Sequence, residues 1–306
     1  MAQQENDNAL AVRFEIPDLG FATVLGFAGE VSYDLAVQHL FSRVSGARLP
    51  QHYMARLPKS VEPTVWIDID PLPDGRASVG FRGAVDSPRY EVDLEGFHWD
   101  FSKVINSLVM DGAANSALLP LHSACLASSH GVVLLPGASG AGKSSISYAA
   151  MAGSHRVLAS ELAFVRGGEF LCGNSALTID SAAIAVFGLS ELRSPDGTDG
   201  SRLVFNLNQQ PPTPISRLVF PQVHPGEPHV RTITTRRARM LLFENVVTQL
   251  PLAQLLSQET WPIWRPPSRD VVEALMDEVS RLSELEPVIV SGHPTGIVTA
   301  IVEGKI

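Results

Sequence analysis

The sequence predicts an α/β domain over residues 116–306 that follows a smaller α+β domain over residues 1–115. Three observations lead to this prediction. The 306 residues are 45% hydrophobic and 18% charged, which is typical of a globular chain with a buried core. The first third consists of short β-branched and aromatic runs separated by turn residues. From about residue 116, strand and helix patterns alternate in quick succession around a glycine-rich turn.

The first domain is predicted from strand-like runs and one amphipathic helix. The runs are VRFEIP (12–17), FATVLGF (21–27), TVWIDID (64–70), ASVGFR (77–82) and RYEVDL (89–94). Residues 72–76, LPDGR, predict a turn between two of them. Residues 31–44 predict a helix, because Leu35, Leu40 and Val44 recur near helical spacing.

A helix predicted over residues 99–117 leads into the second domain. Strands are then predicted over 119–127 and 131–136, followed by the glycine-rich turn, a short helix and a strand over 156–165. This order of elements is the pattern of an α/β layered domain.

The rest of the second domain has fewer clear elements. Residues 194–230 are rich in Pro, Gly and Asp, and they predict loops around the strands LVFNL (203–207) and ISRLVFP (215–221). Residues 268–285 predict a late helix that starts at Ser268 or Asp270 and carries its apolar residues on one face.

Residues 137–144, which we call the phosphate loop, carry the most specific motif in the chain. Their sequence, Gly-Ala-Ser-Gly-Ala-Gly-Lys-Ser, matches G-x-x-x-x-G-K-[ST] without a mismatch. Glycines let backbone N–H groups turn toward phosphate oxygens, and the following helix points its positive end at the same anion. A chance match is the alternative, and the apolar strand before the loop and the helix-compatible run after it argue against chance.

The motif assigns roles to individual residues. Lys143 is expected to reach the β- and γ-phosphates of ATP, and the Ser144 hydroxyl is expected to bind Mg²⁺. The expected nucleotide-binding residues are Gly137, Ala138, Ser139, Gly140, Ala141, Gly142, Lys143, Ser144 and Ser145.

Charge and cysteine content exclude several classes of protein. The net charge of −9 argues against nucleic-acid binding, which needs clustered Lys and Arg. Cys125 and Cys172 are too few for a disulfide framework or a four-ligand zinc site, and their apolar surroundings predict buried free thiols. The start lacks a signal-peptide pattern, and no apolar run reaches the ~20 residues of a membrane span. We therefore expect a cytoplasmic protein without membrane or nucleic-acid partners.

The surroundings of the phosphate loop resemble the HPr kinase/phosphorylase superfamily. The segments that carry the resemblance are LHSACLASSHGVVLLPGASGAGKSS (121–145), SHRVLASELAFV (154–165) and PISRLVFPQVHPGEPHVRTIT (214–234). The match is to the diverse HPr-kinase-like relatives, because the long glycine-containing signature of the regulatory enzyme is missing. The resemblance implies an α/β P-loop kinase domain, preceded by the smaller α+β domain.

The resemblance also implies which side chains carry the chemistry. In the superfamily, a histidine precedes the loop and an acidic pair follows one short helix after it. His122 matches the histidine, and Ser160-Glu161 stands at the acidic pair, so the first acid is replaced. Glu161 is then expected to contact the metal with Ser144 and to take the acceptor's proton, with His122 tuning its basicity. The alternatives are a hydrogen-bonded core histidine and a surface carboxylate.

Transition-state charge on the transferred phosphate requires cations besides Mg²⁺. Lys143 is one, and Arg236 or Arg237 is expected to be another. Asp180 and Glu244 are further carboxylates that would serve as second metal ligands.

The sequence thus predicts an ATP- and Mg²⁺-dependent kinase that acts on a hydroxyl of a small metabolite or a precursor peptide, in a tailoring pathway as the resemblance implies. The first domain is expected to help form the acceptor site. Because the first acid is replaced, two alternatives stay open: a nucleotide-binding sensor or scaffold, and a nucleoside triphosphatase that assists a partner enzyme. Whether the chain forms a homo-oligomer also stays open.

Overall fold

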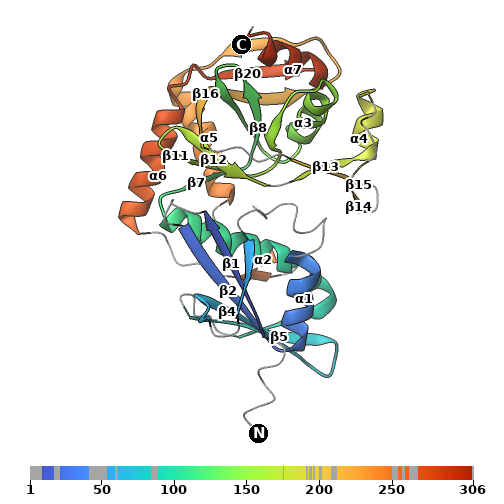
Figure 1. The fold of residues 1–306 in the computed structure, drawn as a ribbon, viewed down its shortest axis with the longest axis vertical. Coiled ribbons are helices and arrows are strands. Elements are labelled where there is room, and N and C mark those ends of the chain that lie inside the picture. The colour runs from blue at the N-terminus through green and yellow to red at the C-terminus, as the bar shows by residue number, and fades with distance from the viewer. Residues whose placement is uncertain are drawn as a thin grey trace. The chain divides into compact units, whose positions relative to one another are not determined.

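The chain folds into two compact units, each with helices and strands, so it is a mixed α/β protein (Figure 1). The computed structural model describes residues 9–16, 21–40, 54–58, 61–83, 89–174, 176–190, 192, 195, 197–199, 202–207, 212–249, 254–256, 259–261 and 268–304. Of these, residues 9–116 and 254–268 form the first unit, and residues 117–249 and 269–304 form the second.

One segment lies in a different unit from the one expected. Residues 116–306 were all expected in the second domain, whereas the described residues between 254 and 268 cluster with the first unit. There β18 (Gln254–Leu256) pairs with β19 (Glu259–Trp261) and contacts helix α2 (Leu94–Asn115). The chain therefore leaves the second unit and returns to it, a route that no local pattern records.

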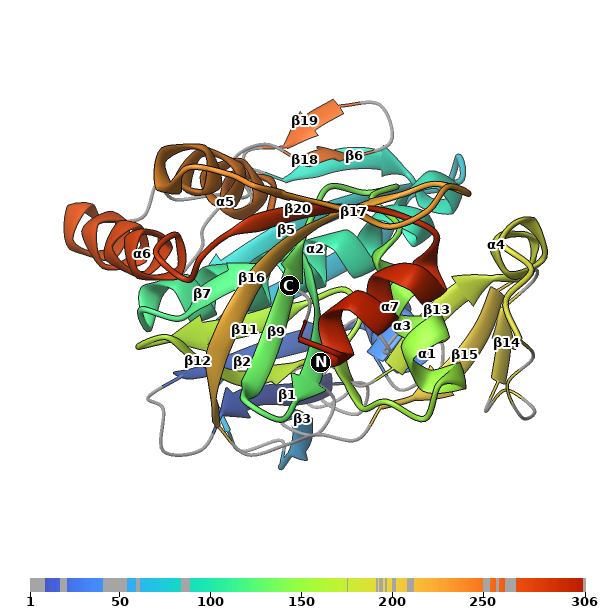
Figure 2. The same ribbon diagram turned by 90° about the horizontal axis from the view of Figure 1, so that it is seen from above.

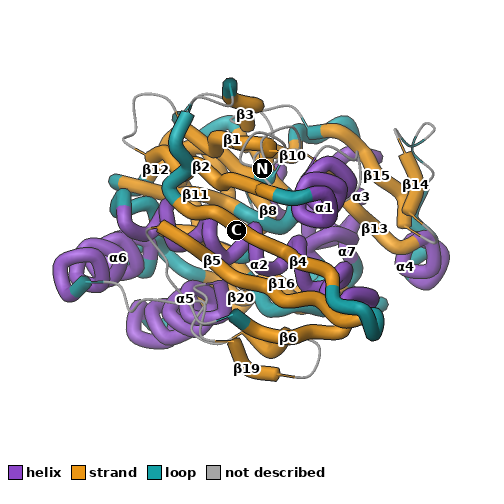
Figure 3. Tube along the Cα trace, turned by 90° about the horizontal axis from the view of Figure 1, so that it is seen from below, coloured by secondary structure: helices purple, strands orange, loops and turns teal. Residues whose placement is uncertain are grey.

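The first unit is built on a six-stranded mixed sheet with strand order β3-β1-β2-β4-β5-β6 (Figure 3). Its strands are β1 (Ala9–Ile16), β2 (Phe21–Ala28), β3 (Met54–Leu57), β4 (Val65–Pro71), β5 (Arg76–Gly83) and β6 (Tyr90–Asp93). Phe14, Phe27, Ile67 and Phe101 are fully buried, so the sheet, α1 (Glu30–Leu40) and α2 share an apolar core. All five predicted strands are confirmed, and the predicted helix is confirmed over its described residues.

The second unit contains a nine-stranded sheet that holds the phosphate loop. Its strands are β7 (Leu119–Leu121), β8 (Ser123–Ser128), β9 (Gly131–Pro136), β10 (Val157–Ala159), β11 (Ala163–Arg166), β12 (Glu169–Gly173), β16 (Thr213–Val223), β17 (His229–Thr232) and β20 (Val288–Gly292). Strand β9, which enters the loop, lies between antiparallel β8 and parallel β16. Strand β20 pairs in parallel with β16 on the side away from β9.

Helices cover this sheet in two pairs, α3 with α7 and α5 with α6 (Figure 2). The bounds are α3 (Lys143–Ala152), α5 (Thr235–Gln249), α6 (Arg269–Leu282) and α7 (Pro294–Val302). Helix α6 confirms the predicted late helix. A smaller sheet with order β13-β15-β14 lies beside α3, and its bounds are β13 (Ala176–Asp180), β14 (Gly197–Asp199) and β15 (Arg202–Asn206). Short helix α4 (Ser181–Val186) follows β13.

Two predicted strands are interrupted. The strand predicted over 119–127 breaks at His122, and the strand predicted over 156–165 breaks at residues 160–162. At both breaks an asparagine side chain forms hydrogen bonds with backbone groups that would pair with a neighbouring strand in a regular sheet. Asn245 binds the N–H and C=O of His122, and Asn174 accepts from the N–H groups of residues 160–162. The prediction of two continuous strands was wrong. Each strand is interrupted by hydrogen bonds to an asparagine outside the run from which the strand was predicted.

Two other expectations have a direct outcome. Cys125 and Cys172 are buried free thiols, as predicted, and burial raises the pKa of both. Within the described residues, no helix is both long and apolar enough to cross a membrane.

Candidate functional site

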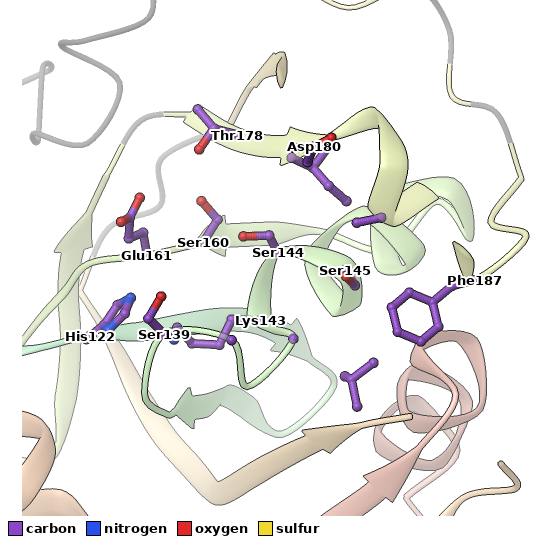
Figure 4. A pocket seen from close by; sticks show the side chains of 15 residues that line it. His122, Ser139, Lys143, Ser144, Ser145, Ser160, Glu161, Thr178, Asp180 and Phe187 are labelled. Carbon is purple, nitrogen blue, oxygen red and sulfur yellow. The ribbon is translucent and has the colours of Figure 1, made fainter. Parts of the chain in front are cut away.

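A cavity of about 460 Å³ opens at the phosphate loop (Figure 4). This volume lies within the roughly 300–1,000 Å³ that is common for small-molecule sites. Four segments of the second unit and the end of β16 line it: His122, Ser139, Gly140, Gly142, Lys143, Ser144, Ser145, Ser160, Glu161, Thr178, Ile179, Asp180, Ala183, Phe187 and Val223. The cavity thus gathers residues from the loop, from both strand interruptions and from the β13–α4 segment.

The shape of the phosphate loop depends on its glycines. Gly140 and Gly142 have φ angles of +83° and +88°, a left-handed conformation that glycine adopts without strain. A Cβ on Gly142 would lie 2.2 Å from Cγ2 of Val223, so no other residue fits there without displacing β16. Helix α3 begins at the next residue, which places its unpaired N-terminal N–H groups at the cavity.

Lys143 is the cation of the cavity and is only 5% exposed. Its Nζ donates to the carbonyl oxygens of Gly137 at 2.7 Å and Ala138 at 2.9 Å. Burial lowers the pKa of Lys143 to about 8, and the Glu161 carboxylate acts in the opposite direction. A buried ammonium is stabilised by a nearby negative charge, so an anion in the cavity would add to the effect of Glu161.

Asn174, which follows β12, fixes the turn that carries Glu161. Its Oδ1 accepts from the backbone N–H groups of Ser160, Glu161 and Leu162 at 3.0, 3.0 and 3.1 Å. Its Nδ2 donates to Ser160 Oγ at 3.0 Å and to the carbonyl oxygen of Ala176 at 2.6 Å. The Asn174 side chain is almost fully buried. It therefore fixes the backbone of the half-buried Glu161 from the interior of the second unit.

Asn245, on α5, performs a similar task for His122. Its Oδ1 accepts from the His122 N–H at 2.8 Å, and its Nδ2 donates to the carbonyl oxygens of His122 at 3.0 Å and Gly137 at 3.4 Å. The same His122 carbonyl accepts from the Gly137 N–H at 3.2 Å. One side chain therefore joins the strand interruption at His122 to the start of the phosphate loop.

Oxygen atoms suited to a hard divalent cation are present in the cavity. Ser144 and Glu161, which the sequence predicts to be metal ligands, both line it. Mg²⁺ uses one or two protein oxygens and fills its other positions with water and phosphate oxygens, so this donor set fits it. Asp180 also lines the cavity, and its Oδ1 accepts from Ala182 N–H at the start of α4. Within the described residues, no group of three or more His, Cys, Asp or Glu has the geometry of a metal site.

Several predicted residues lie away from the cavity. Arg236, Arg237 and Glu244 are exposed on α5 and are not among the lining residues. From Arg237 to Asn245, which reaches the loop, the helix rises about 12 Å at about 1.5 Å per residue. The start of α5 thus lies about 12 Å along the helix from the residue that contacts the loop. Gly137, Ala138 and Ala141 shape the loop without lining the cavity, and the first two hold Lys143 through their carbonyls.

Sequence reasoning missed the asparagines and the apolar end of the cavity. Asn174 and Asn245 follow no motif, and Asn245 lies 123 residues after its partner His122. Phe187 and Val223 line the cavity, although the sequence marks them only as ordinary apolar residues. Only their nearness to the phosphate loop identifies these two residues, and this nearness arises when the chain folds.

Comparison with known proteins gives no further assignment, because neither a protein-family model nor a curated protein sequence matches the chain. The geometry of the cavity is therefore the basis for any function. It combines a glycine loop at a helix N-terminus, a buried ammonium, a carboxylate held by its backbone turn, and hydroxyl groups. A helix N-terminus and an ammonium both favour an anion, and a carboxylate is a common general base.

Proposed function

We propose that this protein is an ATP- and Mg²⁺-dependent kinase that phosphorylates a hydroxyl group of a small metabolite or peptide, in a P-loop domain of the HPr-kinase-like type. The observation that carries the proposal is that Lys143 and Glu161, which come from separate segments, line one cavity with the N-terminus of α3. Phosphoryl transfer needs a positioned polyphosphate, neutralised charge and an acceptor for the hydroxyl proton. The cavity contains residues for each of these tasks.

The phosphate loop would bind the donor. Its backbone N–H groups and the first turn of α3 would hold the phosphate oxygens, and Lys143 would leave the carbonyls of Gly137 and Ala138 to pair with the β- and γ-phosphates. Ser144 and Glu161 would hold Mg²⁺, which when bound neutralises phosphate charge. Lys143 adds a second positive charge at the site of transfer.

Glu161 would accept the proton of the attacking hydroxyl. The turn that Asn174 holds keeps the Glu161 carboxylate at the cavity, so little reorganisation is needed when the acceptor arrives. His122 lines the same end of the cavity as Glu161, and Asn245 holds its backbone there. Arg236 and Arg237 are exposed on α5, so in this proposal Lys143 and the metal carry the transition-state charge.

Ser160 favours a second candidate function. Its hydroxyl donates to the carbonyl oxygen of Ala176, so it is a structural group and supplies no second carboxylate. A cavity with a single carboxylate at this end would also suit a nucleoside triphosphatase that assists a partner enzyme, or a nucleotide sensor. ADP release separates these functions when it is measured with Mg-ATP alone and with a panel of hydroxyl metabolites and serine peptides. Release that depends on an acceptor supports the kinase, release without one supports the hydrolase, and ATP binding without release supports the sensor.

A further inference from the structure

We propose that the apolar end of the cavity, formed by Phe187 and Val223, is the subsite for the nucleobase, and that His293 is the residue that positions Phe187. The proposal deepens the function proposed above and rests on it, because it requires a nucleoside triphosphate at the phosphate loop. It adds the binding mode of the part of the donor that the loop does not contact.

The orientation of the donor follows from where the proton acceptor lies. The transferred phosphate must face Glu161, so the nucleoside must extend away from it. Figure 4 shows Phe187 at the opposite end of the cavity from Glu161 and His122, with Ser144 and Ser145 between them. A triphosphate that runs along the start of α3 therefore directs its base toward Phe187.

The wall at this end is a built structure. Phe187 follows α4, and its carbonyl oxygen lies 2.7 Å from Nε2 of His293. A carbonyl only accepts, so Nε2 carries the proton, while Nδ1 accepts from the Thr295 N–H at 3.3 Å at the start of α7. The two rings also meet edge to face, with centroids 5.9 Å apart. His293 thus fixes both the backbone and the ring of Phe187.

Val223 connects this wall to the phosphate loop. It ends β16, lines the cavity and lies directly against Gly142, where a Cβ would meet its side chain at 2.2 Å. The position of the loop is therefore coupled to the apolar surface on which a base would lie. Phe187 is half-buried, so part of the aromatic residue remains accessible at the cavity.

A half-buried aromatic ring at the end of a polyphosphate site suits a planar base. Stacking of a base on an aromatic side chain does not depend on which base it is, because every base has a π-face. We therefore expect adenine and guanine nucleotides to use Phe187 equally. The competing occupant of this wall is an apolar part of the acceptor, and the experiment below decides between them.

The test compares nucleotides with a ligand that has no base. Titration calorimetry in Mg²⁺ would measure the affinities of ATP, GTP and inorganic tripolyphosphate for wild type, Phe187→Ala and Phe187→Leu. We expect both variants to bind ATP and GTP roughly 5- to 150-fold more weakly, the range for loss of a stacking aromatic. Their affinity for tripolyphosphate should equal that of wild type, because the phosphate loop is unchanged.

Two matched variants sharpen the result. His293→Asn keeps an N-cap for α7 but has too short a side chain to reach the Phe187 carbonyl, so it should show a smaller loss for nucleotides and none for tripolyphosphate. Phe243→Ala removes another phenylalanine, which is 47% exposed on α5, and should change none of the three affinities.

The outcomes distinguish failure of the inference from failure of the proposed function. Tripolyphosphate binding that is weakened by Lys143→Ala, together with unchanged ATP and GTP affinity in both Phe187 variants, would overturn only the nucleobase subsite. An equal loss for nucleotides and tripolyphosphate would also overturn it, because Phe187 would then support the loop. If wild type and Lys143→Ala bind tripolyphosphate equally, the phosphate loop is not a phosphate site, and both proposals are wrong.

Discussion

Replacing Asn174 with alanine tests how the cavity holds its carboxylate. The substitution removes the oxygen that accepts from the N–H groups of Ser160, Glu161 and Leu162, and it removes the amide that donates to Ser160 Oγ and the Ala176 carbonyl. The side chain of Glu161 and the phosphate loop are left intact. A change in turnover of the folded variant would therefore come from the turn formed by residues 160–162, which carries Glu161.

The magnitude follows from the burial of the released groups. Residues 160 and 162 are buried, and each buried N–H left without an acceptor costs about 1–3 kcal/mol. We expect Asn174→Ala to lower the free energy of unfolding by about 2–6 kcal/mol. A displacement of the Glu161 carboxylate by about 1 Å would lower kcat roughly 100-fold. KM for ATP should change little, because Lys143 and the loop amides still bind the donor.

The assay measures urea denaturation, kcat and KM for ATP for three variants. Asn174→Asp retains an oxygen that accepts the three N–H groups but loses the donor to Ser160 Oγ and to the Ala176 carbonyl, so its kcat should lie between those of wild type and Asn174→Ala. Asn115→Ala serves as the control, since this asparagine is exposed at the end of α2. A folded Asn174→Ala protein with wild-type kcat would refute the reasoning, and so would a rise in KM alone.

Three other predictions concern Lys143, the metal and Glu161. Because burial lowers the pKa of Lys143 to about 8 and phosphate binding needs the ammonium, tripolyphosphate affinity measured by calorimetry should begin to fall as the pH approaches 8 and fall about tenfold per unit well above it. Lys143→Met should bind weakly with no such fall. The sign for stability is the reverse: the folded protein holds this proton less tightly than the unfolded chain, so the free energy of unfolding without ligand should rise between pH 8 and 10.5. Excess EDTA should abolish ADP release and added Mg²⁺ should restore it, and full turnover in EDTA would contradict the proposed Ser144–Glu161 metal site. Glu161→Gln should lower acceptor-dependent ADP release by about 10²- to 10⁴-fold with a much smaller change in ATP affinity, and wild-type turnover would transfer the role of base to His122.

Local patterns predict what is encoded locally. The glycine loop, the strand before it and helix α6 follow from residue types at short spacing, and the structure contains all three elements. The interruptions at His122 and at residues 160–162 could not be predicted, because apolar residues on both sides of each break continue the strand pattern. They form only when Asn245 and Asn174 reach the backbone from other elements. Propensity was overridden by tertiary hydrogen bonds.

The contents of the cavity show the same limit. Lys143, Ser144 and Glu161 could be placed together from the motif and the resemblance, and they do line one cavity. Arg236 and Arg237 were selected for their charge alone, and the direction of α5 leaves them exposed. No sequence motif identifies Phe187. It lines the cavity because the preceding strand β13 contacts α3 in the folded chain.

The serine before Glu161 and the asparagine after β12 form a matched pair. Ser160 is 3% exposed, and its hydroxyl donates to the Ala176 carbonyl while it accepts from Asn174 Nδ2. A carboxylate at position 160 would present only acceptors to that carbonyl, so it would lose the bond and repel the oxygen. It would also add a negative charge to a cavity that already has Glu161 and Asp180 against the single ammonium of Lys143. With serine there, the turn is satisfied by hydrogen bonds, and the cavity has a lower negative charge, as binding of the proposed anionic nucleotide would require.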